Sequence, residues 1–507
     1  MNKSISRGSF VLIVSGLVCK LLGAFFRLPL TSILGIEGIG VFQMVMAVYS
    51  FALILTSGGF SAALSRLVSQ ARARGEIGKI KWLLKKSIVY ALTFGLGVGL
   101  ILSLLSKNIA VAQGAEAGVL GYKLMIALIP MGGVISALRG IFQGYENMFP
   151  TAISQIIEQI FKFSLGLIFA FILGKFSIAF GVFGGFLGVT AGEIAAIIYL
   201  LIYMKVKVKF EPLSSPIAKP MFLQAVLPLS LGASVLPLVG ALDSFIVANR
   251  LVLAGFSAET ATALFGLQTG VVAAILGFPL IISNAISTAI LPSISYQDAL
   301  LSTQTQQKVS QSLKVMWFVL MPLVFGLAAV SRPLYQFVYP SLDENMLAFA
   351  VNLTYFGCVS TIITALMQFF VMLLQAKGKF GYCMSAYMLG GAIKIILVYV
   401  LCALPAINIY GVVIGNIALA STVAIMALVK NRRKIAVGIY ELTLPLLSSL
   451  AMTLAIVLFQ HSFALSPLLQ IICDILIGGV IYLFFTLPVL SDMLKVVFGH
   501  RHDELLG

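Results

Sequence analysis

Long apolar runs separated by short polar segments fill nearly all of the 507 residues. A helix needs about 20 apolar residues to cross a bilayer. The pattern therefore predicts an all-α, polytopic membrane protein with about fourteen transmembrane helices. The expected spans lie near 9–34, 39–64, 87–106, 118–138, 151–174, 178–204, 221–249, 260–291, 312–331, 346–376, 381–403, 410–429, 440–460 and 467–489.

The longest polar break in this pattern divides the chain into halves. It is the basic segment KVKVKFEPLSSPIAKP, residues 205–220, which is rich in Pro and Ser. We predict an N-terminal six-helix lobe at 1–204, a cytoplasmic linker at 205–220 and a second six-helix lobe at 221–434. A terminal helix pair and a cytoplasmic tail are expected to occupy 435–507.

The two halves carry similar residues at constant spacing, which predicts an internal repeat. Four small residues of the second span recur 226 positions later, and a Gln and a Lys recur 232 positions later. Both halves are expected to begin on the same side of the membrane, so the repeat is parallel and its pseudo-twofold axis follows the membrane normal. Two such lobes typically rock around a central site in alternating access. The matched residues are Ser57, Ser61, Ala63 and Ser69 with Ser283, Ser287, Ala289 and Ser295, and Gln143 and Lys162 with Gln375 and Lys394.

Composition and charge exclude several other classes of protein. Hydrophobic residues make up 60% of the chain and charged residues 10%, which no water-soluble domain could carry. The net charge of +16 comes from Lys and Arg in short segments between apolar runs, mostly on the side of the N-terminus. This distribution predicts that both termini are cytoplasmic and gives no nucleic-acid-binding face. The sequence has no HExxH, CxxC or GxxxxGK[ST] motif, so we expect no metal and no bound cofactor.

Two cations in the first span are the strongest functional signal. A charged side chain inside a bilayer costs at least about 2.5–3.5 kcal/mol, so it usually meets a partner or a wet cavity. Lys20 and Arg27 are seven residues apart and therefore differ by only about 20° in direction on a helix. Pro29 is expected to bend or locally unwind the helix just beyond them. The pair favours an anionic ligand such as a diphosphate, and the alternative is snorkelling to the interface.

Further charges lie inside other predicted spans. Glu158 and Lys162, four residues apart, could instead form a local ion pair. Lys394 needs another helix, water or substrate as its partner. Asp243 and Arg250 are expected to cap the outer rim of the cavity or to form a salt bridge between the lobes. The predicted diphosphate-binding cations are Lys20, Arg27, Lys123, Lys162 and Lys394, and the predicted gating or coupling charges are Glu158, Glu193, Asp243 and Arg250.

Several segments resemble the stage V sporulation protein B family, which includes lipid II flippase-like proteins within the multidrug, oligosaccharidyl-lipid and polysaccharide exporter superfamily. The similar segments are KLLGAFFRLPLTSILGIEGIGVFQM at 20–44, SGGFSAALSRLVSQARARGE at 57–76, FQGYENMFPTAISQIIEQIFK at 142–162, and the seventh and eighth spans. The resemblance covers essentially the whole chain. It implies fourteen helices and transport of an undecaprenyl-diphosphate-linked glycan, such as lipid II, across the bacterial plasma membrane during polysaccharide, peptidoglycan or spore wall synthesis.

The resemblance also implies roles for particular residues and partners. Basic residues of the first helix are thought to meet the diphosphate in the related flippases, which would assign this role to Lys20 and Arg27. The expected partners are the lipid-linked glycan and membrane lipids, with a functional monomer. Coupling to protons, sodium or the membrane potential stays open.

Other functions remain as alternatives. The first is a cation-coupled multidrug exporter that uses Glu158, Glu193 and Asp243. An enzyme such as a membrane-embedded glycan polymerase or ligase would typically need a sizeable outer loop that bears catalytic residues. The longest outer segment, 331–345, is short, so an enzyme is not expected.

Overall fold

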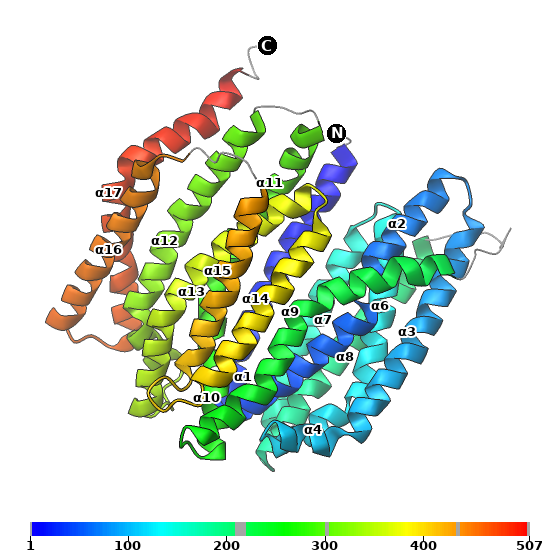
Figure 1. Cartoon of the computed structure of the whole chain (residues 1–507), viewed down its shortest axis with the longest axis horizontal. Helices are drawn as coiled ribbons and strands as arrows, with labels where there is room; N and C mark the ends of the chain where they lie inside the picture. Colours follow the sequence, from blue (N-terminus) through cyan, green and yellow to red (C-terminus); the bar gives the residue numbers. More distant parts are fainter. Residues whose placement is uncertain (1–2, 208–219, 300–303, 432–436, 504–507) are drawn as a thin grey trace. The chain divides into compact units, whose positions relative to one another are not determined.

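A computed structural model of the chain describes residues 3–207, 220–299, 304–431 and 437–503, and these form an all-helical membrane fold without a strand (Figure 1). Thirteen stretches of these residues are long and apolar enough to cross a membrane. The first, Val14–Ala73, has 60 residues. At 1.5 Å per residue it is about 90 Å long, enough for two crossings of a core of about 30 Å. The predicted polytopic all-α class is confirmed.

The first half of the described chain consists of helices whose limits match the fifth and sixth predicted spans most closely. They are α1 (Lys3–Ser57), α2 (Phe60–Ala73), α3 (Gly78–Leu104), α4 (Ser106–Ala112), α5 (Val119–Lys123), α6 (Met125–Gly144), α7 (Phe149–Gly174) and α8 (Ile178–Lys207), with a 3₁₀ turn η1 (Glu116–Gly118) before α5.

The second half is also helical throughout the described residues. It consists of α9 (Pro220–Leu253), α10 (Ala258–Gly266), a π-helical segment η2 (Leu267–Val272), α11 (Ala273–Ala299), α12 (Gln304–Val338), α13 (Glu344–Ala376), α14 (Phe380–Leu401), α15 (Tyr410–Asn431), α16 (Ile439–Ser462) and α17 (Pro467–Asp503).

The long helix α1 is broken at Gly35, between the first and second predicted spans. Gly35 has φ 73° and ψ 176°, a conformation that costs glycine little because it has no Cβ. Pro29 lies within helical residues. The helix is therefore not unwound at Pro29, and its break lies at the glycine six residues later, whereas a bend at Pro29 stays a prediction.

The described chain divides into two compact units. Unit 1 comprises residues 1–271 and 387–415, and unit 2 comprises 272–386 and 416–507. These limits differ from those of the two lobes predicted from the sequence. The lobes are predicted as the bodies that move during transport, and that stays a prediction. Most of the predicted linker, 208–219, lies outside the described residues.

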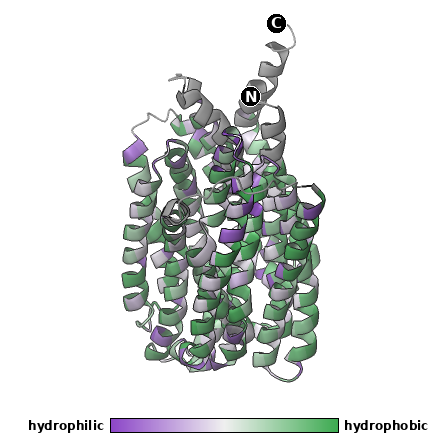
Figure 2. Cartoon of the chain, turned by 90° about the vertical axis from the view of Figure 1, so that its right-hand side faces the viewer, coloured by the Kyte–Doolittle hydropathy of each residue, from purple (hydrophilic) through white to green (hydrophobic). Residues whose placement is uncertain are grey.

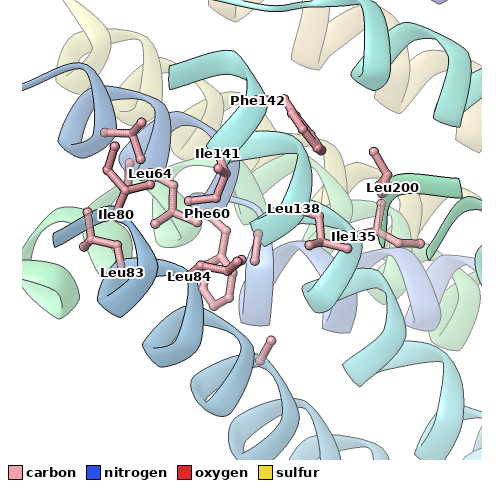
Figure 3. Close-up of a cluster of buried hydrophobic side chains, with 14 of the residues drawn as sticks. Phe60, Leu64, Ile80, Leu83, Leu84, Ile135, Leu138, Ile141, Phe142 and Leu200 are labelled. Atoms are coloured by element: carbon pink, nitrogen blue, oxygen red, sulfur yellow. The ribbon is translucent and has the colours of Figure 1, made fainter. Parts of the chain in front are cut away.

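Unit 1 has an apolar core formed by α2, α3, α6 and α8. Side chains at helical spacing on α2 and α3 pack against one face of α6, and Leu200 of α8 completes the cluster (Figure 3). This core holds α6 in place beside α2 and α3, and α6 in turn contacts α7 and α8. The labelled members are Phe60, Leu64, Ile80, Leu83, Leu84, Ile135, Leu138, Ile141, Phe142 and Leu200.

Glycines of α8 let α7 approach unusually closely. Gly184, Gly188 and Gly192 are spaced four residues apart and face α7. A Cβ at Gly188 would lie 2.1 Å from the Cα of Gly166, and one at Gly192 would lie 2.5 Å from the Glu158 carbonyl oxygen. These contacts agree with the close helix packing expected of small residues at four-residue spacing. They fix the part of α7 that carries Glu158 and Lys162.

Unit 2 is organised around α12, which contacts α11, α13 and the terminal helices α16 and α17. The Trp317 indole N–H donates to the Leu442 carbonyl (2.9 Å), and the Tyr482 hydroxyl donates to the Phe318 carbonyl (2.7 Å). A small core of Ala329, Met452, Ile456 and Tyr482 fills the contact. The terminal pair therefore packs on α12 inside a unit that also contains α11 and α13.

Most positions along the helices are occupied by hydrophobic residues (Figure 2), and many of these are exposed. Along α3, for example, the exposed residues include Val89, Leu92, Leu96 and Leu100. Exposed leucine and valine in such continuous stripes are typical of helices that face lipid acyl chains.

Candidate functional site

The first predicted site residues, Lys20 and Arg27, lie on the first part of α1, before the break at Gly35. Lys20 is exposed and Arg27 is half-buried. The Arg27 guanidinium Nη1 donates to the Thr269 carbonyl at 3.4 Å. Thr269 belongs to the π-helical segment η2, in which the usual carbonyl pairing of an α-helix is altered. Arg27 is thus oriented by the backbone of a second element of unit 1.

Polar side chains also line the contact between α1 and α7. The Ser15 hydroxyl donates to the Gln155 side-chain oxygen at 3.4 Å. A Cβ at Gly23 would lie 3.9 Å from the side-chain oxygen of Gln159. Gln155, Gln159 and Lys162 are spaced four and three residues apart, so they share one face of α7. That face is directed toward α1.

Lys162 is the predicted cation that the structure brings toward Arg27. Its ammonium lies 5.6 Å from the ring centroid of Phe26, the neighbour of Arg27, within the range of a cation–π contact. Two helices therefore place like charges in one neighbourhood. We call Lys20, Arg27 and Lys162 the α1–α7 cation group.

Glu158 forms an ion pair with a residue that the sequence analysis missed. The Arg139 Nη2 lies 2.8 Å from the Glu158 Oε2, and the Arg139 Nε donates to the Ser154 hydroxyl at 2.9 Å. Among the described residues no ion pair joins Glu158 to Lys162. The local pairing of these two residues is therefore wrong, because an arginine from α6 pairs with the carboxylate through its Nη2 while its Nε donates to Ser154. Arg139 is the one charged residue within α6, and it was missed because the fourth span was expected to end at residue 138.

Glu193 of α8 is buried against the second part of α1. The Tyr49 hydroxyl donates to the Glu193 Oε1 at 2.5 Å, and the other carboxylate oxygen has no hydrogen-bond partner among the described groups. Glu193 is only 3% exposed. Burial of a carboxylate is costly unless it is paired or hydrogen-bonded, so the bond from Tyr49 offsets part of the cost of burying this acid. Its predicted gating or coupling role stays a prediction.

Asp243 and Lys394 form a buried ion pair between α9 and α14. The Lys394 ammonium lies 2.6 Å from the Asp243 Oδ2, and both side chains are 10% exposed. Of the three kinds of partner expected for Lys394, the structure provides another helix. A direct contact with substrate at Lys394 stays a prediction.

Arg250, seven residues or about two helical turns after Asp243, also contacts α14. Its Nε donates to the Tyr399 carbonyl at 2.8 Å, and its guanidinium lies 3.9 Å from the Tyr399 ring centroid. Arg250 and Asp243 thus both hold α9 to α14, and the acid is engaged with Lys394. The expected cap over a cavity rim stays a prediction.

Lys123 lies apart from the other predicted cations. It ends the short helix α5 and precedes α6, which begins at Met125, so it lies before the long helix and not inside it as expected. Its side chain is exposed. The predicted fourth span begins too early because α5 and α6 form one apolar run in the sequence. A contact of Lys123 with substrate stays a prediction.

Comparisons with known proteins show which family and which relatives this chain is similar to. Residues 5–297 match the model of a family described as polysaccharide biosynthesis protein. Stage V sporulation protein B of Bacillus subtilis (strain 168) is 26% identical over 80% of this chain and 79% of its own length. Lipid II flippase MurJ of the same organism is 24% identical over 78% of this chain and 77% of its own length.

A solved structure shares the fold over nearly the whole chain. It is lipid II flippase MurJ in an inward closed conformation, at 16% identity and a TM-score of 0.72, covering 96% of this chain and all of that one. The chain is therefore a multi-pass protein of the bacterial plasma membrane.

Proposed function

Because the chain belongs to the polysaccharide biosynthesis protein family, we propose that it is a flippase for an undecaprenyl-diphosphate-linked glycan precursor. The cargo would be lipid II or a polysaccharide repeat unit, moved from the cytoplasmic to the outer leaflet by alternating access. One similar protein is named a lipid II flippase and another a sporulation protein. These names support a lipid-linked glycan as the class of cargo.

The observation that carries the proposal is the contact of Lys162 with the ring of Phe26, the neighbour of Arg27, within apolar helices. Two cations that repel each other favour an anion that contacts both. A diphosphate suits them, because an arginine presents a planar fork of donors and a lysine a compact charge. Hydrogen bonds to charged groups contribute about 1.5–3 kcal/mol each. The α1–α7 cation group would therefore offset a large part of the cost of bringing the headgroup out of water.

The proposed transport cycle uses few of the charged residues directly. Lys20, the exposed member of the group, meets the diphosphate first, and Arg27 and Lys162 hold it while the isoprenoid tail stays in lipid. Lys123 and Lys394 are secondary candidates for contacts with the headgroup. Coupling to protons, sodium or the membrane potential would involve Glu193, and we propose a functional monomer that leaves the glycan chemically unchanged.

The rival function, a cation-coupled exporter of cationic drugs, needs carboxylates that can receive a cation. Of its three predicted acids, Glu158 is paired with Arg139 and Asp243 with Lys394. Glu193 accepts a hydrogen bond from Tyr49. This pattern supports the flippase over the exporter. Drug resistance on overexpression that disappears in Asp243→Asn would reverse the choice.

The test is translocation of a labelled lipid-linked glycan in vesicles that contain the purified protein. Arg27→Ala, Lys20→Ala and Lys162→Gln are compared with Lys107→Gln, which removes an exposed lysine from α4. Loss of one contact of about 1.5–3 kcal/mol predicts a rate roughly 10 to 100 times lower for Arg27→Ala and Lys162→Gln. Lys107→Gln should match the unmodified protein. Unchanged rates in all three test variants, at equal amounts of inserted protein, would remove the mechanism.

A further inference from the structure

A basic surface lies where α2 ends and α3 begins, away from the α1–α7 cation group. The sequence between residues 66 and 86 contains one acidic residue, Glu76, whose carboxylate is paired with Lys79 at 2.6 Å. The remaining cations therefore have no acid nearby in sequence to balance them. We define the α2–α3 basic surface as the six exposed residues Arg66, Arg72, Arg74, Lys81, Lys85 and Lys86.

The lysines of this surface continue the lipid-facing stripe of α3. Lys81, Lys85, Val89, Leu92 and Leu96 follow one another at intervals of four, four, three and four residues, so they lie along one side of the helix. Val89, Leu92 and Leu96 are 40–46% exposed. The stripe thus changes from apolar to cationic between Val89 and Lys85, within about 6 Å along the axis. This is where acyl chains give way to headgroups.

Trp82 marks the same level of the membrane. Its half-buried ring lies on α3 between Lys81 and Lys85, and the Lys86 ammonium lies 6.0 Å from the ring centroid. Tryptophan is enriched at the membrane–water interface because its ring is apolar and its N–H is polar. The position of Trp82 therefore agrees with the change of character along the stripe.

We propose that the α2–α3 basic surface binds the headgroups of anionic glycerophospholipids in the adjacent leaflet. A cluster of four to eight Lys and Arg residues next to a transmembrane helix attracts anionic lipid strongly. Positive charge at this level would also be satisfied by water, so the proposal requires a measurable preference for anionic over zwitterionic lipid. This inference concerns the bilayer lipids and does not depend on the identity of the transported cargo.

The experiment uses the two tryptophans of the chain as local probes. In Trp317→Phe the sole tryptophan is Trp82, and in Trp82→Phe it is Trp317. Each protein is reconstituted in bilayers containing either brominated phosphatidylglycerol or brominated phosphatidylcholine, and the quenching of fluorescence gives the relative occupancy of nearby lipid sites. Trp317 is a suitable control, because the neighbouring cation Lys314 is paired with Glu441.

We expect phosphatidylglycerol to occupy the sites near Trp82 roughly five times as often as phosphatidylcholine. This ratio corresponds to the attraction that about one basic residue has for an anionic membrane surface. The preference should fall toward one in Lys81→Gln/Lys85→Gln, which leaves Lys86 over the ring. It should persist in Lys107→Gln, a lysine just beyond the opposite end of α3, and be absent at Trp317. Equal quenching by both lipids at Trp82, or a preference that survives Lys81→Gln/Lys85→Gln, would overturn the proposal.

Discussion

Substitution of Gly188 by alanine tests whether close packing of α7 on α8 positions the α1–α7 cation group. The added Cβ would lie 2.1 Å from the Cα of Gly166 and 2.4 Å from its backbone nitrogen. Carbon atoms in ordinary contact are about 3.5–4.0 Å apart. The helices must therefore separate by more than about 1 Å, since both close atoms belong to the backbone and cannot rotate away.

Two effects should follow from this separation. Overpacking typically costs about 1–3 kcal/mol of stability, which would lower the temperature at which the detergent-solubilised protein unfolds. Displacement of Lys162 relative to Arg27 should also slow translocation, because a misplacement of about 1 Å can reduce a rate up to about 100-fold.

The matched control is Gly97→Ala, at an exposed helical glycine of α3 where the new Cβ has nothing within 4 Å. Alanine favours a helix over glycine by up to about 1 kcal/mol, so Gly97→Ala should be neutral or slightly stabilising. Fluorescence-detected size-exclusion chromatography after heating compares the two variants with the unmodified protein. If Gly188→Ala unfolds and transports as Gly97→Ala does, the packing argument is refuted.

Substitutions at three buried polar contacts are tested by the same heating assay. Lys394→Met leaves the buried Asp243 unpaired and should destabilise the protein by about 3–5 kcal/mol, whereas the double variant Asp243→Asn/Lys394→Met should recover most of the loss. Equal stability of the single and the double variant would contradict the ion pair. Asp474→Ala removes the acceptor of the Gln470 amide (3.0 Å) and should cost about 1–3 kcal/mol, and Asp474→Asn should cost less because one carbonyl oxygen remains. Tyr49→Phe removes the donor to Glu193 and should also cost about 1–3 kcal/mol, so an unaltered unfolding temperature would exclude a stabilising role for that bond.

The positions of the helices were largely predictable, because a bilayer requires long apolar runs with polar ends. The break at Gly35 falls between two spans that the sequence had already separated. The limits of α6 were not predictable, since the apolar run of α5 continues into it without a polar residue other than Lys123. That shift placed Arg139 outside the expected span and hid its pairing with Glu158.

The residues of the site could be found individually, whereas their partners could not. A lone charge in an apolar run is visible in the sequence, as Lys394 and Glu193 show. The choice between a partner four residues away and one on another helix depends on tertiary packing. Glu158 pairs with Arg139 instead of Lys162 for this reason, and the approach of Lys162 to Phe26 depends on the glycines of α8.

The most direct test of the central claim is the relative affinity of the protein for undecaprenyl diphosphate and undecaprenyl monophosphate, measured by native mass spectrometry. The α1–α7 cation group predicts a preference for the diphosphate that falls about tenfold or more in Arg27→Gln and in Lys162→Gln. Lys107→Gln should retain the preference. An equal affinity for the two lipids in the unmodified protein, or a preference that persists in Arg27→Gln/Lys162→Gln, would contradict diphosphate recognition by these cations.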